Sequence, residues 1–282
     1  GTIKITERTI QLPRLGILRL KEHGYFPTGV KITAATVSEC AGHWFVSIRT
    51  DEEPKRPLGT EVFGVDVGIE HLAVLSDGTV FENPKALKSA EGRLRRLHKS
   101  VSRKHKGSCN RRKAIARLAR QYYRVSCIRN DAIHKATDVI TKRAAVLGIE
   151  ALTVAGMMQN HHLARGLSDA ALGEFLRQSK YKMAWSGGIV VEADRFYPSS
   201  KTCSACGYML DLLPLSVREW DCPKCGTHHN RDRNAAINLR NMAARLAVTA
   251  CGVASSGSGS TGTKLVTLKQ EPNTIQGVVL DG

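Results

Sequence analysis

The chain has 282 residues, enough for one large domain with a sizeable core and a small additional module. Lysine and arginine total 42 against 25 acidic residues, so the formal net charge of +17 predicts a polyanionic partner. No run of 18 apolar residues occurs, which excludes a transmembrane helix, and the aromatic content of 5% favours phosphate contacts over a base-stacking platform. We therefore expect a soluble protein without a membrane partner.

The first 60 residues contain short alternating apolar runs separated by proline and glycine, which predict β-strands. These strands belong either to the end of a small β-barrel or to a free-standing sheet, and we favour the barrel. The sequence begins with Gly1 and has neither the charged start nor the apolar block of a signal peptide. We expect it to be a fragment or a processed form of a longer chain.

Residues 62–82 read "VFGVDVGIEHLAVLSDGTVFE", in which two apolar runs lead to a turn at Asp77 and Gly78. The pattern predicts a three-stranded antiparallel meander. Asp66 lies inside the first of these strands, between two valines. A carboxylate in an otherwise buried strand must be paired or bound to a metal ion.

Residues 85–145 hold 19 lysines and arginines against three acidic residues, nearly the whole positive excess of the chain. Apolar residues recur at helical spacing, and the break around Gly107 predicts two helices in a hairpin. Ordinary solvated helices mix charges of both signs, so we favour a phosphate-binding face. Its candidate nucleic-acid-binding residues are Arg95, Arg96, Arg103, Lys104, Arg111, Arg112, Lys113, Arg117 and Arg120.

The next segments alternate between strand and helix. Residues 148–154 predict a short buried strand that carries Glu150, and residues 187–200 predict another. Between them, residues 168–185 predict an amphipathic helix with four inward residues, Leu172, Phe175, Leu176 and Met183. This alternation is typical of an α/β domain. The glycine- and serine-rich segment 251–282 is expected to be disordered.

Four of the eight cysteines form two Cys-x-x-Cys pairs, Cys203 with Cys206 and Cys222 with Cys225. The 15 intervening residues allow two knuckles to close a tetrahedral zinc site, and a glycine follows each pair and relaxes its turn. Four thiolates close the coordination sphere, so this zinc is expected to be structural, and a direct role for His228 or His229 is disfavoured. Clustering of this kind favours a reducing compartment.

Asp232 follows the second cysteine pair and opens a helical pattern. Locally, it is either the N-cap of that helix or an acid of a catalytic site. Together with Asp66 and Glu150 it gives two acids on separate buried strands and a third at a helix start. Such a set suits a two-metal site in a chain that binds phosphates.

Five segments occur in a fixed order: "GVDVGIEHLAVLSDG", "GIEALTVAGMMQN", "YPSSKTCSACGY", "REWDCPKCG" and "RDRNAAINL". In this the chain resembles TnpB-type (OrfB) endonucleases of insertion sequences, relatives of the compact type V CRISPR effector nucleases, over roughly residues 10 to 275. The resemblance implies an RNase H-like (RuvC-type) nuclease guided by an RNA from the element's own end, with target DNA as its substrate. The expected location is the prokaryotic cytoplasm, on the nucleoid when DNA is bound.

The resemblance implies that the catalytic acids are Asp66, Glu150 and Asp232. They would hold two Mg²⁺ or Mn²⁺ ions about 3.5–4 Å apart, with Asp66 bridging both, Glu150 binding one and Asp232 the other. Asn234 would help to orient the last acid. The implied zinc ligands are the four clustered cysteines, and the chain departs from the pattern at Ala151, where relatives carry an acid.

Relatives also place a helical recognition lobe and the first strands of a wedge barrel before the equivalent of Gly1, so weakened or missing reading of the DNA motif beside the target is expected. The implied domains are the closing barrel strands (1–60), the nuclease domain (61–196) with its basic hairpin (85–145), the zinc ribbon (197–231), the last nuclease helix (232–250) and the tail (251–282). The main alternative is a nucleic-acid-binding remnant or regulator that does not cut. A transposase is a weaker third possibility, and no oligomeric state is predicted.

Overall fold

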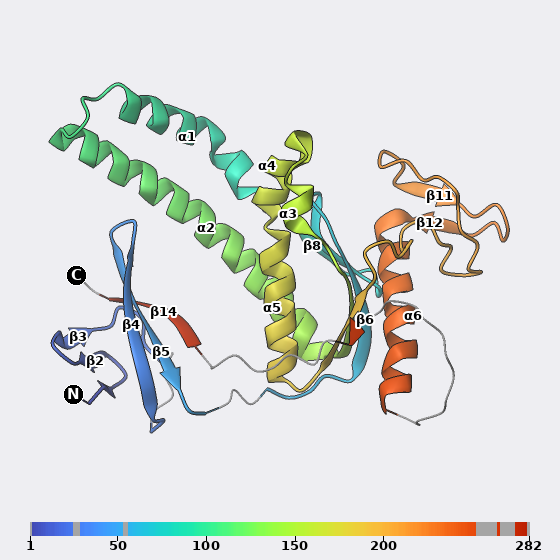
Figure 1. Cartoon of the computed structure of the whole chain (residues 1–282), viewed down its shortest axis with the longest axis horizontal. Coiled ribbons are helices and arrows are strands. Elements are labelled where there is room, and N and C mark those ends of the chain that lie inside the picture. Colours follow the sequence, from blue (N-terminus) through green and yellow to red (C-terminus); the bar gives the residue numbers. More distant parts are fainter. Residues whose placement is uncertain (1, 25–28, 53–55, 252–263, 266–273, 281–282) are drawn as a thin grey trace. The chain divides into compact units, whose positions relative to one another are not determined.

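The computed structural model describes residues 2–24, 29–52, 56–251, 264–265 and 274–280 (Figure 1). The chain divides into two compact units. The first comprises Gly1–Lys55, Ser89–Cys127 and Gln270–Gly282, and the second comprises Arg56–Lys88 and Ile128–Lys269. Among the helices that are described, none is both long and apolar enough to span a bilayer.

The first unit contains two three-stranded antiparallel sheets. One has the order β1-β2-β3 and the other the order β14-β5-β4. Their bounds are Lys4–Ile5 (β1), Thr9–Leu12 (β2), Gly16–Arg19 (β3), Ile32–Cys40 (β4), His43–Thr50 (β5) and Thr274–Leu280 (β14). Residues from both sheets, including Ile10, Leu12 and Ile48, share one apolar core. The strands expected in residues 1–60 are confirmed, whereas their closure into a barrel stays a prediction.

The basic hairpin consists of α1, Ala86–Ser102, and α2, Cys109–Arg143. The connection contains Gly107 at φ +83°, a conformation that favours glycine, so the predicted break is confirmed. His98 Nε2 on α1 and the Tyr122 hydroxyl on α2 lie 2.8 Å apart and join the two helices.

The second unit is built on a six-stranded mixed sheet with the order β13-β10-β9-β6-β7-β8. β6, β7 and β8 form the predicted antiparallel meander, while β9 and β10 run parallel to β6. The bounds are Glu61–Val67 (β6), His71–Leu75 (β7), Val80–Glu82 (β8), Ala144–Glu150 (β9), Ile189–Ala193 (β10) and Lys264–Leu265 (β13). The predicted α/β class is confirmed.

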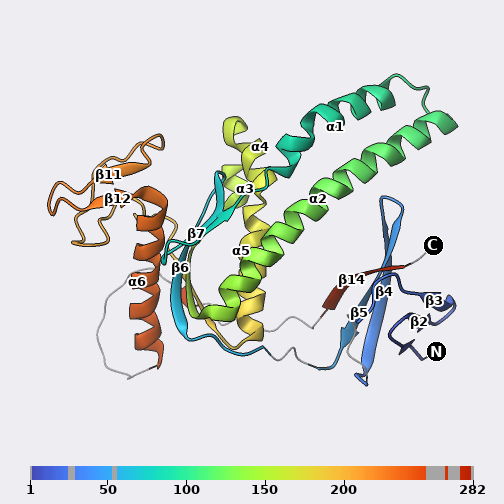
Figure 2. The ribbon, with the colours of Figure 1, turned by 180° about the vertical axis from the view of Figure 1, so that it is seen from behind.

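Helices cover both faces of this sheet (Figures 1 and 2). Phe63, Leu147 and Val190 face a core completed by α2, α4 (His161–Ala170) and α5 (Leu172–Trp185). The alternate residues Val62, Val146 and Val191 face α6, Arg231–Cys251. This two-residue alternation is the geometry of a strand, and it produces three layers with the sheet in the middle.

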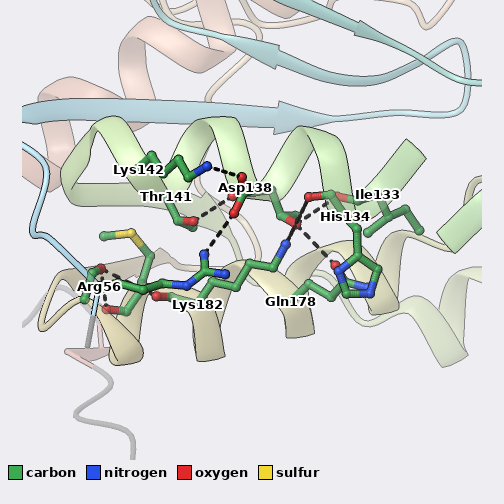
Figure 3. Close-up of polar contacts among 11 residues, drawn as sticks. Arg56, Ile133, His134, Asp138, Thr141, Lys142, Gln178 and Lys182 are labelled. Atoms are coloured by element: carbon green, nitrogen blue, oxygen red, sulfur yellow. Dashed lines mark hydrogen bonds and ion pairs between the residues drawn. The ribbon is translucent and has the colours of Figure 1, made fainter. Parts of the chain in front are cut away.

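A buried polar cluster joins α2 to α5 inside the second unit (Figure 3). The Lys182 ammonium donates to the Thr137 hydroxyl at 2.8 Å and to the His134 carbonyl at 3.0 Å, although the residue is only 3% exposed. Arg56 and Lys142 both pair with Asp138 at the edge of the cluster. Burial raises the pKa of Asp138, but the hydrogen bonds from these two cations bring it below its ordinary value.

Four predicted elements differ from the structure, and one of them is the strand expected for 187–200, because β10 covers only Ile189–Ala193. The helix predicted for 168–185 is divided at Ala171, whose φ of +51° ends α4 and starts α5, although its four inward residues are buried as expected. The strand expected for 148–154 ends at Glu150, and the short helix α3, Val154–Met157, follows it. Most of the tail expected to be disordered lies outside the described residues. Its described parts after α6 are the strands β13 and β14.

Candidate active site and metal centre

Two of the predicted catalytic acids stand at the ends of neighbouring parallel strands. Val65 of β6 pairs with Ile149 of β9, and Asp66 and Glu150 directly follow these two residues. Because side chains alternate along a strand, both carboxylates lie on the face that carries α6. Asp232 lies in the first turn of α6, so the fold brings all three acids to one face of the sheet.

Two glycines allow α6 to lie close to that face. Gly64 and Gly148 each come two residues before an acid, on the same face of the sheet. A β-carbon on Gly64 would overlap the Ala236 carbonyl, and one on Gly148 would overlap the Leu239 carbonyl of α6. A larger residue at either position would therefore push α6, and Asp232 with it, away from the other two acids.

The electrostatics of Asp66 reflect this crowding. Burial, followed by the negative charges of Glu150 and Asp232, raises the pKa of the Asp66 carboxyl well above its ordinary value. The described residues contain one group of cysteine, histidine or acidic side chains placed to hold a metal ion, and it is the cysteine cluster. The three acids are thus electrostatically coupled without forming such a group.

Arg218 is a site residue that sequence reasoning missed. Its guanidinium lies 3.4 Å from Asp232 Oδ1 and 3.2 Å from Glu70 Oε2, so a cation from the ribbon pairs with the last acid. It stands inside the "REWDCPKCG" segment, but an arginine in that segment gave no sign of its ion-pair partners.

The N-cap alternative for Asp232 is not what the structure has. Asn230 precedes α6, and its side-chain oxygen accepts a hydrogen bond from the Arg233 backbone N–H at 3.2 Å. Asn230 therefore caps the helix, because an N-cap oxygen bonds the third helical N–H. Asp232 lies one position inside the helix, where its carboxylate is directed to Arg218 instead.

Glu150 also has a hydrogen-bond partner that the sequence did not reveal. The Ser199 hydroxyl donates to Glu150 Oε1 at 2.5 Å, and Ser199 is almost fully buried. Asn234, predicted to orient the last acid, instead accepts a hydrogen bond from the Ser204 N–H at 3.0 Å and donates to the Thr202 carbonyl at 2.7 Å. It therefore joins α6 to the loop that precedes the first cysteine knuckle.

The four predicted zinc ligands, Cys203, Cys206, Cys222 and Cys225, converge in one cluster in which all sulfur atoms lie within 4.8 Å of one another. Two of the separations are 3.7 Å (Cys203 to Cys225) and 3.6 Å (Cys206 to Cys222). Tetrahedral zinc with Zn–S bonds of 2.3 Å requires about 3.8 Å between sulfurs. The donor set and its spacing therefore fit a zinc ion.

The two knuckles repeat the same backbone geometry. The Gly207 N–H donates to the Cys203 carbonyl at 2.9 Å, and the Gly226 N–H donates to the Cys222 carbonyl at 2.8 Å. The two glycines have φ values of +76° and +72°, as expected from their positions after each pair. The ribbon strands β11, Glu219–Asp221, and β12, His228–Asn230, complete this module.

Two side chains around the cluster affect its sulfur atoms. His229 is buried against Trp220, and its Nε2 lies 3.0 Å from Cys203 Sγ, so it contacts a ligand sulfur. Hydrogen bonds from the Thr227 hydroxyl and backbone lower the pKa of the Cys225 thiol to about 6. A low thiol pKa favours the thiolate, which is the form that binds metal.

The basic hairpin presents most of its predicted cations to solvent. Lys104 and Arg111 are half-buried, while the other seven candidates are exposed. At the C-terminal end of α1, a surface hollow of about 350 Å³ is lined by Arg96, Lys99, Ser100, Arg103 and Lys104. Lys99 and Ser100 were missed, because a helical pattern in the sequence does not show which side chains surround a hollow.

Comparison with known families gives two matches on different parts of the chain. The family OrfB_IS605, described as "Probable transposase", matches residues 45–161. The family described as "Cas12f1-like, TNB domain" matches residues 173–239, which include the cysteine cluster and Asp232.

Curated relatives match across most of the chain. A Streptomyces pristinaespiralis protein named "Putative RNA-guided DNA endonuclease" is 43% identical over 228 residues, covering 80% of this chain and 56% of that protein. The Escherichia coli K12 protein "Putative RNA-guided DNA endonuclease InsQ" is 34% identical over 260 residues, covering 86% and 63% respectively. The chain thus spans between half and two thirds of the length of these relatives.

Two solved structures of Cas12f complexes match part of this chain. A cryo-EM structure of a CRISPR-Cas12f ternary complex gives a TM-score of 0.49 at 22% identity and covers 70% of this chain and 42% of that chain. A Cas12f1-sgRNA-target DNA complex gives a TM-score of 0.46 at 17% identity and covers 73% and 55%.

Proposed function

The chain is a TnpB-type (OrfB) protein, and on that basis we propose that it acts as an RNA-guided, divalent-metal-dependent DNA endonuclease associated with an insertion sequence. The observation that carries the proposal is the placement of Asp66 and Glu150 at adjacent parallel strand ends, with Asp232 opening the helix on the same face. The names of the two curated relatives support the same activity.

The nuclease domain would be RNase H-like, and the strand order supports this part of the proposal. An antiparallel meander, β6 to β8, continues into two parallel strands, and the acids lie on the face covered by α6. The proposed domains keep the predicted bounds: wedge-barrel strands (1–60), nuclease domain (61–196) with its basic hairpin (85–145), zinc ribbon (197–231), last nuclease helix (232–250) and tail (251–282).

The three acids, Asp66, Glu150 and Asp232, would hold two Mg²⁺ or Mn²⁺ ions. Hard cations prefer such oxygen ligands, and a cation here would offset the burial and the negative charges of Glu150 and Asp232, which raise the pKa of Asp66. When bound, the ions supply an activated water and stabilise the leaving oxygen. The part of the protein is to hold the carboxylates: Ser199 restrains Glu150, and α6 carries Asp232 to the sheet.

The zinc ribbon and the basic hairpin would have separate roles. Zinc bound by the four cysteines would fix the ribbon without taking part in cleavage, because four thiolates leave no open coordination position. The nine predicted cations of the hairpin would contact phosphates of the guide RNA and the target DNA, and the hollow on α1 offers one such position.

Alanine substitution of each acid tests the proposal. Asp66→Ala, Glu150→Ala and Asp232→Ala should each lower Mg²⁺- or Mn²⁺-dependent cleavage at least about 100-fold, because several kcal/mol of transition-state stabilisation would be lost. RNA binding should change little, since the basic hairpin is intact. The matched control is Asp211→Ala, which removes an exposed acid from the ribbon.

Cleavage is measured in the context of the full-length protein, on a plasmid matched to the RNA that copurifies with it, after that RNA has been sequenced. A discrete guide RNA together with loss of cutting in the three acid variants would support the nuclease. Full cutting by Asp232→Ala would contradict the proposed triad. Binding without any cleavage by the wild-type chain would instead favour the nucleic-acid-binding alternative.

A further inference from the structure

Ser199 is held at both of its polar ends. Its hydroxyl donates to Glu150 Oε1, and its carbonyl accepts a hydrogen bond from Asn238 Nδ2 at 2.8 Å. Only 3% of Ser199 is exposed. A buried hydroxyl that bonds a carboxylate restricts the rotation of that carboxylate, so the position of Ser199 determines the direction in which Glu150 presents its oxygens.

Two asparagines of α6 form the other side of this arrangement. Asn234 and Asn238 are four residues apart, so they lie on one face of the helix. Both side-chain amides donate to the Thr202 carbonyl at 2.7 Å, and Asn234 Oδ1 accepts from the Ser204 N–H at 3.0 Å. Both residues are nearly completely buried, where an unpaired amide would be costly. We name Ser199, Asn234 and Asn238 the loop clamp.

The loop clamp surrounds the first metal ligand. Cys203 lies between the two clamped backbone positions, Thr202 and Ser204, and is itself 1% exposed. The Cys203 N–H donates to the Tyr208 carbonyl at 2.7 Å, which ties the ligand to its knuckle. Five peptide bonds therefore separate Ser199, which contacts Glu150, from Ser204 at the end of the clamped loop. If the knuckle around Cys203 moves, this short, hydrogen-bonded segment must move with it.

The same helix also carries another acid. Asp232 lies two residues before Asn234 in the first turn of α6, so the clamp fixes the loop to the element that positions Asp232. The cysteine cluster is thus connected to Glu150 through Ser199 and to Asp232 through Asn234. If the loop moves, the buried amides of Asn234 and Asn238 lose the Thr202 carbonyl as their acceptor, and an unsatisfied buried amide is costly. The loop and α6 therefore keep their positions together.

We propose that Ser199 is a positioning residue for Glu150, and that the loop clamp makes the divalent-ion affinity of the three acids depend on occupation of the cysteine cluster by metal. The inference rests on the proposed nuclease function and adds a regulatory link to it. Loss of the cluster metal releases the knuckle, the clamp loosens, and Glu150 and Asp232 lose their fixed positions. Zinc status then controls the acid site without zinc contacting the substrate.

The test is a cycle of Mn²⁺ affinities measured by the electron paramagnetic resonance of free Mn²⁺, without any cleavage assay. The four samples are wild type and Ser199→Ala, each with the cluster metal retained or removed by a thiol reagent and chelator. We expect Ser199→Ala to bind Mn²⁺ about tenfold more weakly with its zinc content unchanged. Metal removal should weaken binding by wild type, and clearly less so in Ser199→Ala, in which the link to Glu150 is already broken and only the link to Asp232 through Asn234 remains.

Two further variants make the result specific. Ser199→Thr keeps the hydroxyl and should restore Mn²⁺ affinity, whereas Ser200→Ala alters the neighbouring side chain, whose hydroxyl takes no part in the clamp, and should match wild type. Hydrogen exchange gives a second measurement: amides of residues 199–204 should lose protection in wild type when the cluster metal is removed. That measurement applies even if Ser199→Ala folds poorly.

Additive effects would overturn the link: metal removal would then weaken Mn²⁺ binding equally in wild type and in Ser199→Ala. Unchanged protection of residues 199–204 after metal removal would overturn it as well. Failure of the proposed function gives a different result, because Asp66→Ala would then bind Mn²⁺ as tightly as wild type. If only the link fails, Asp66→Ala still loses Mn²⁺.

Discussion

Cys225 is the exposed member of a cluster whose other partners are more buried. Thr227 lowers the pKa of its thiol to about 6, so near neutral pH this sulfur carries the negative charge that a metal ion needs. Replacing one of four thiolates opens the coordination sphere and removes most of the affinity, because the remaining ligands must hold the ion without a closed tetrahedron.

Cys225→Ser is therefore expected to lose the one metal ion per chain that wild type binds. Zinc released by a mercurial reagent and read with a colorimetric chelator gives the stoichiometry. The control is Cys109→Ser, which removes an exposed thiol at the start of α2. Wild type purified without zinc, or Cys225→Ser that retains a full equivalent, would contradict the assignment of the cluster.

Lys182 is a cation that the fold buries almost completely. Burial lowers the pKa of its ammonium to about 8, against about 10.4 for an unfolded lysine. As pH rises, the folded state loses this proton first, so between these two values the unfolded state binds more protons and stability increases with pH. This gain in the free energy of unfolding is therefore absent below about pH 8 and complete above about pH 10.4.

Lys182→Met should therefore remove a pH-dependent contribution to the free energy of unfolding. Over the interval from pH 8 to 10.4, wild type should gain up to about 3 kcal/mol relative to this variant. Urea unfolding at several pH values measures the difference, and Lys135→Met, which removes an exposed lysine of α2, is the control. Parallel pH profiles for wild type and Lys182→Met would show that the ammonium is not destabilised by the fold.

The contact between α6 and the sheet depends on residues without side chains. Gly148→Ala would place a β-carbon onto the Leu239 carbonyl, and a backbone atom cannot move aside as a flexible side chain can. Overpacking of this kind costs about 1–3 kcal/mol. The variant should unfold at lower temperature and, because α6 carries Asp232, should also bind Mn²⁺ more weakly.

Gly92→Ala is the matched control for this change. Gly92 lies within α1 with nothing within 4 Å of an added β-carbon, so alanine should stabilise the helix by roughly 0.5–1 kcal/mol. Thermal unfolding of both variants checks the prediction. Equal stability of Gly148→Ala and wild type would mean that α6 does not pack as closely as described.

Elements with a clear hydrophobic periodicity could be predicted, whereas contacts between segments far apart in the sequence could not. The meander around Asp66 and the two basic helices have local signals, and the cysteine spacing indicated its own cluster. No local pattern shows that β6 and β9 are parallel neighbours, which is what brings Asp66 next to Glu150. The break at Ala171 escaped prediction because alanine favours helices, and here the tertiary context imposes a left-handed backbone.

The partners of the acids were beyond the reach of the sequence for a similar reason. Ser199 and Arg218 are ordinary residues in their segments, and only the folded chain reveals that one bonds Glu150 and the other pairs with Asp232. The sequence left the N-cap reading of Asp232 open because Asn230 and Asp232 are both good capping residues two positions apart, and the structure gives the cap to Asn230.

The charge of the whole chain, +17, predicts how it binds nucleic acid. Affinity for RNA or a hybrid duplex should fall steeply with salt, with a slope of roughly −0.7 to −0.9 per phosphate neutralised. Replacing Arg111, Arg112 and Arg117 with glutamate should flatten that slope, while the three acid variants should leave it unchanged. Filter binding across a salt series measures it, and Lys135→Gln, outside the dense part of the hairpin, is the control. An affinity independent of salt would contradict a phosphate-binding face.

The ribbon joins the rest of its unit through a narrow stem. The chain enters the ribbon near Ser204 and leaves it near Asn234, and the Ser204 N–H donates to the Asn234 side chain. The tip of the loop between these two positions carries exposed residues such as Leu212 and Leu215. Changes of length at that tip leave the stem spacing unaltered, since exposed loop tips tolerate insertion when their ends stay fixed. The tip is thus a grafting position, where a fluorescent reporter or an additional binding peptide can be installed without re-engineering the acids below it.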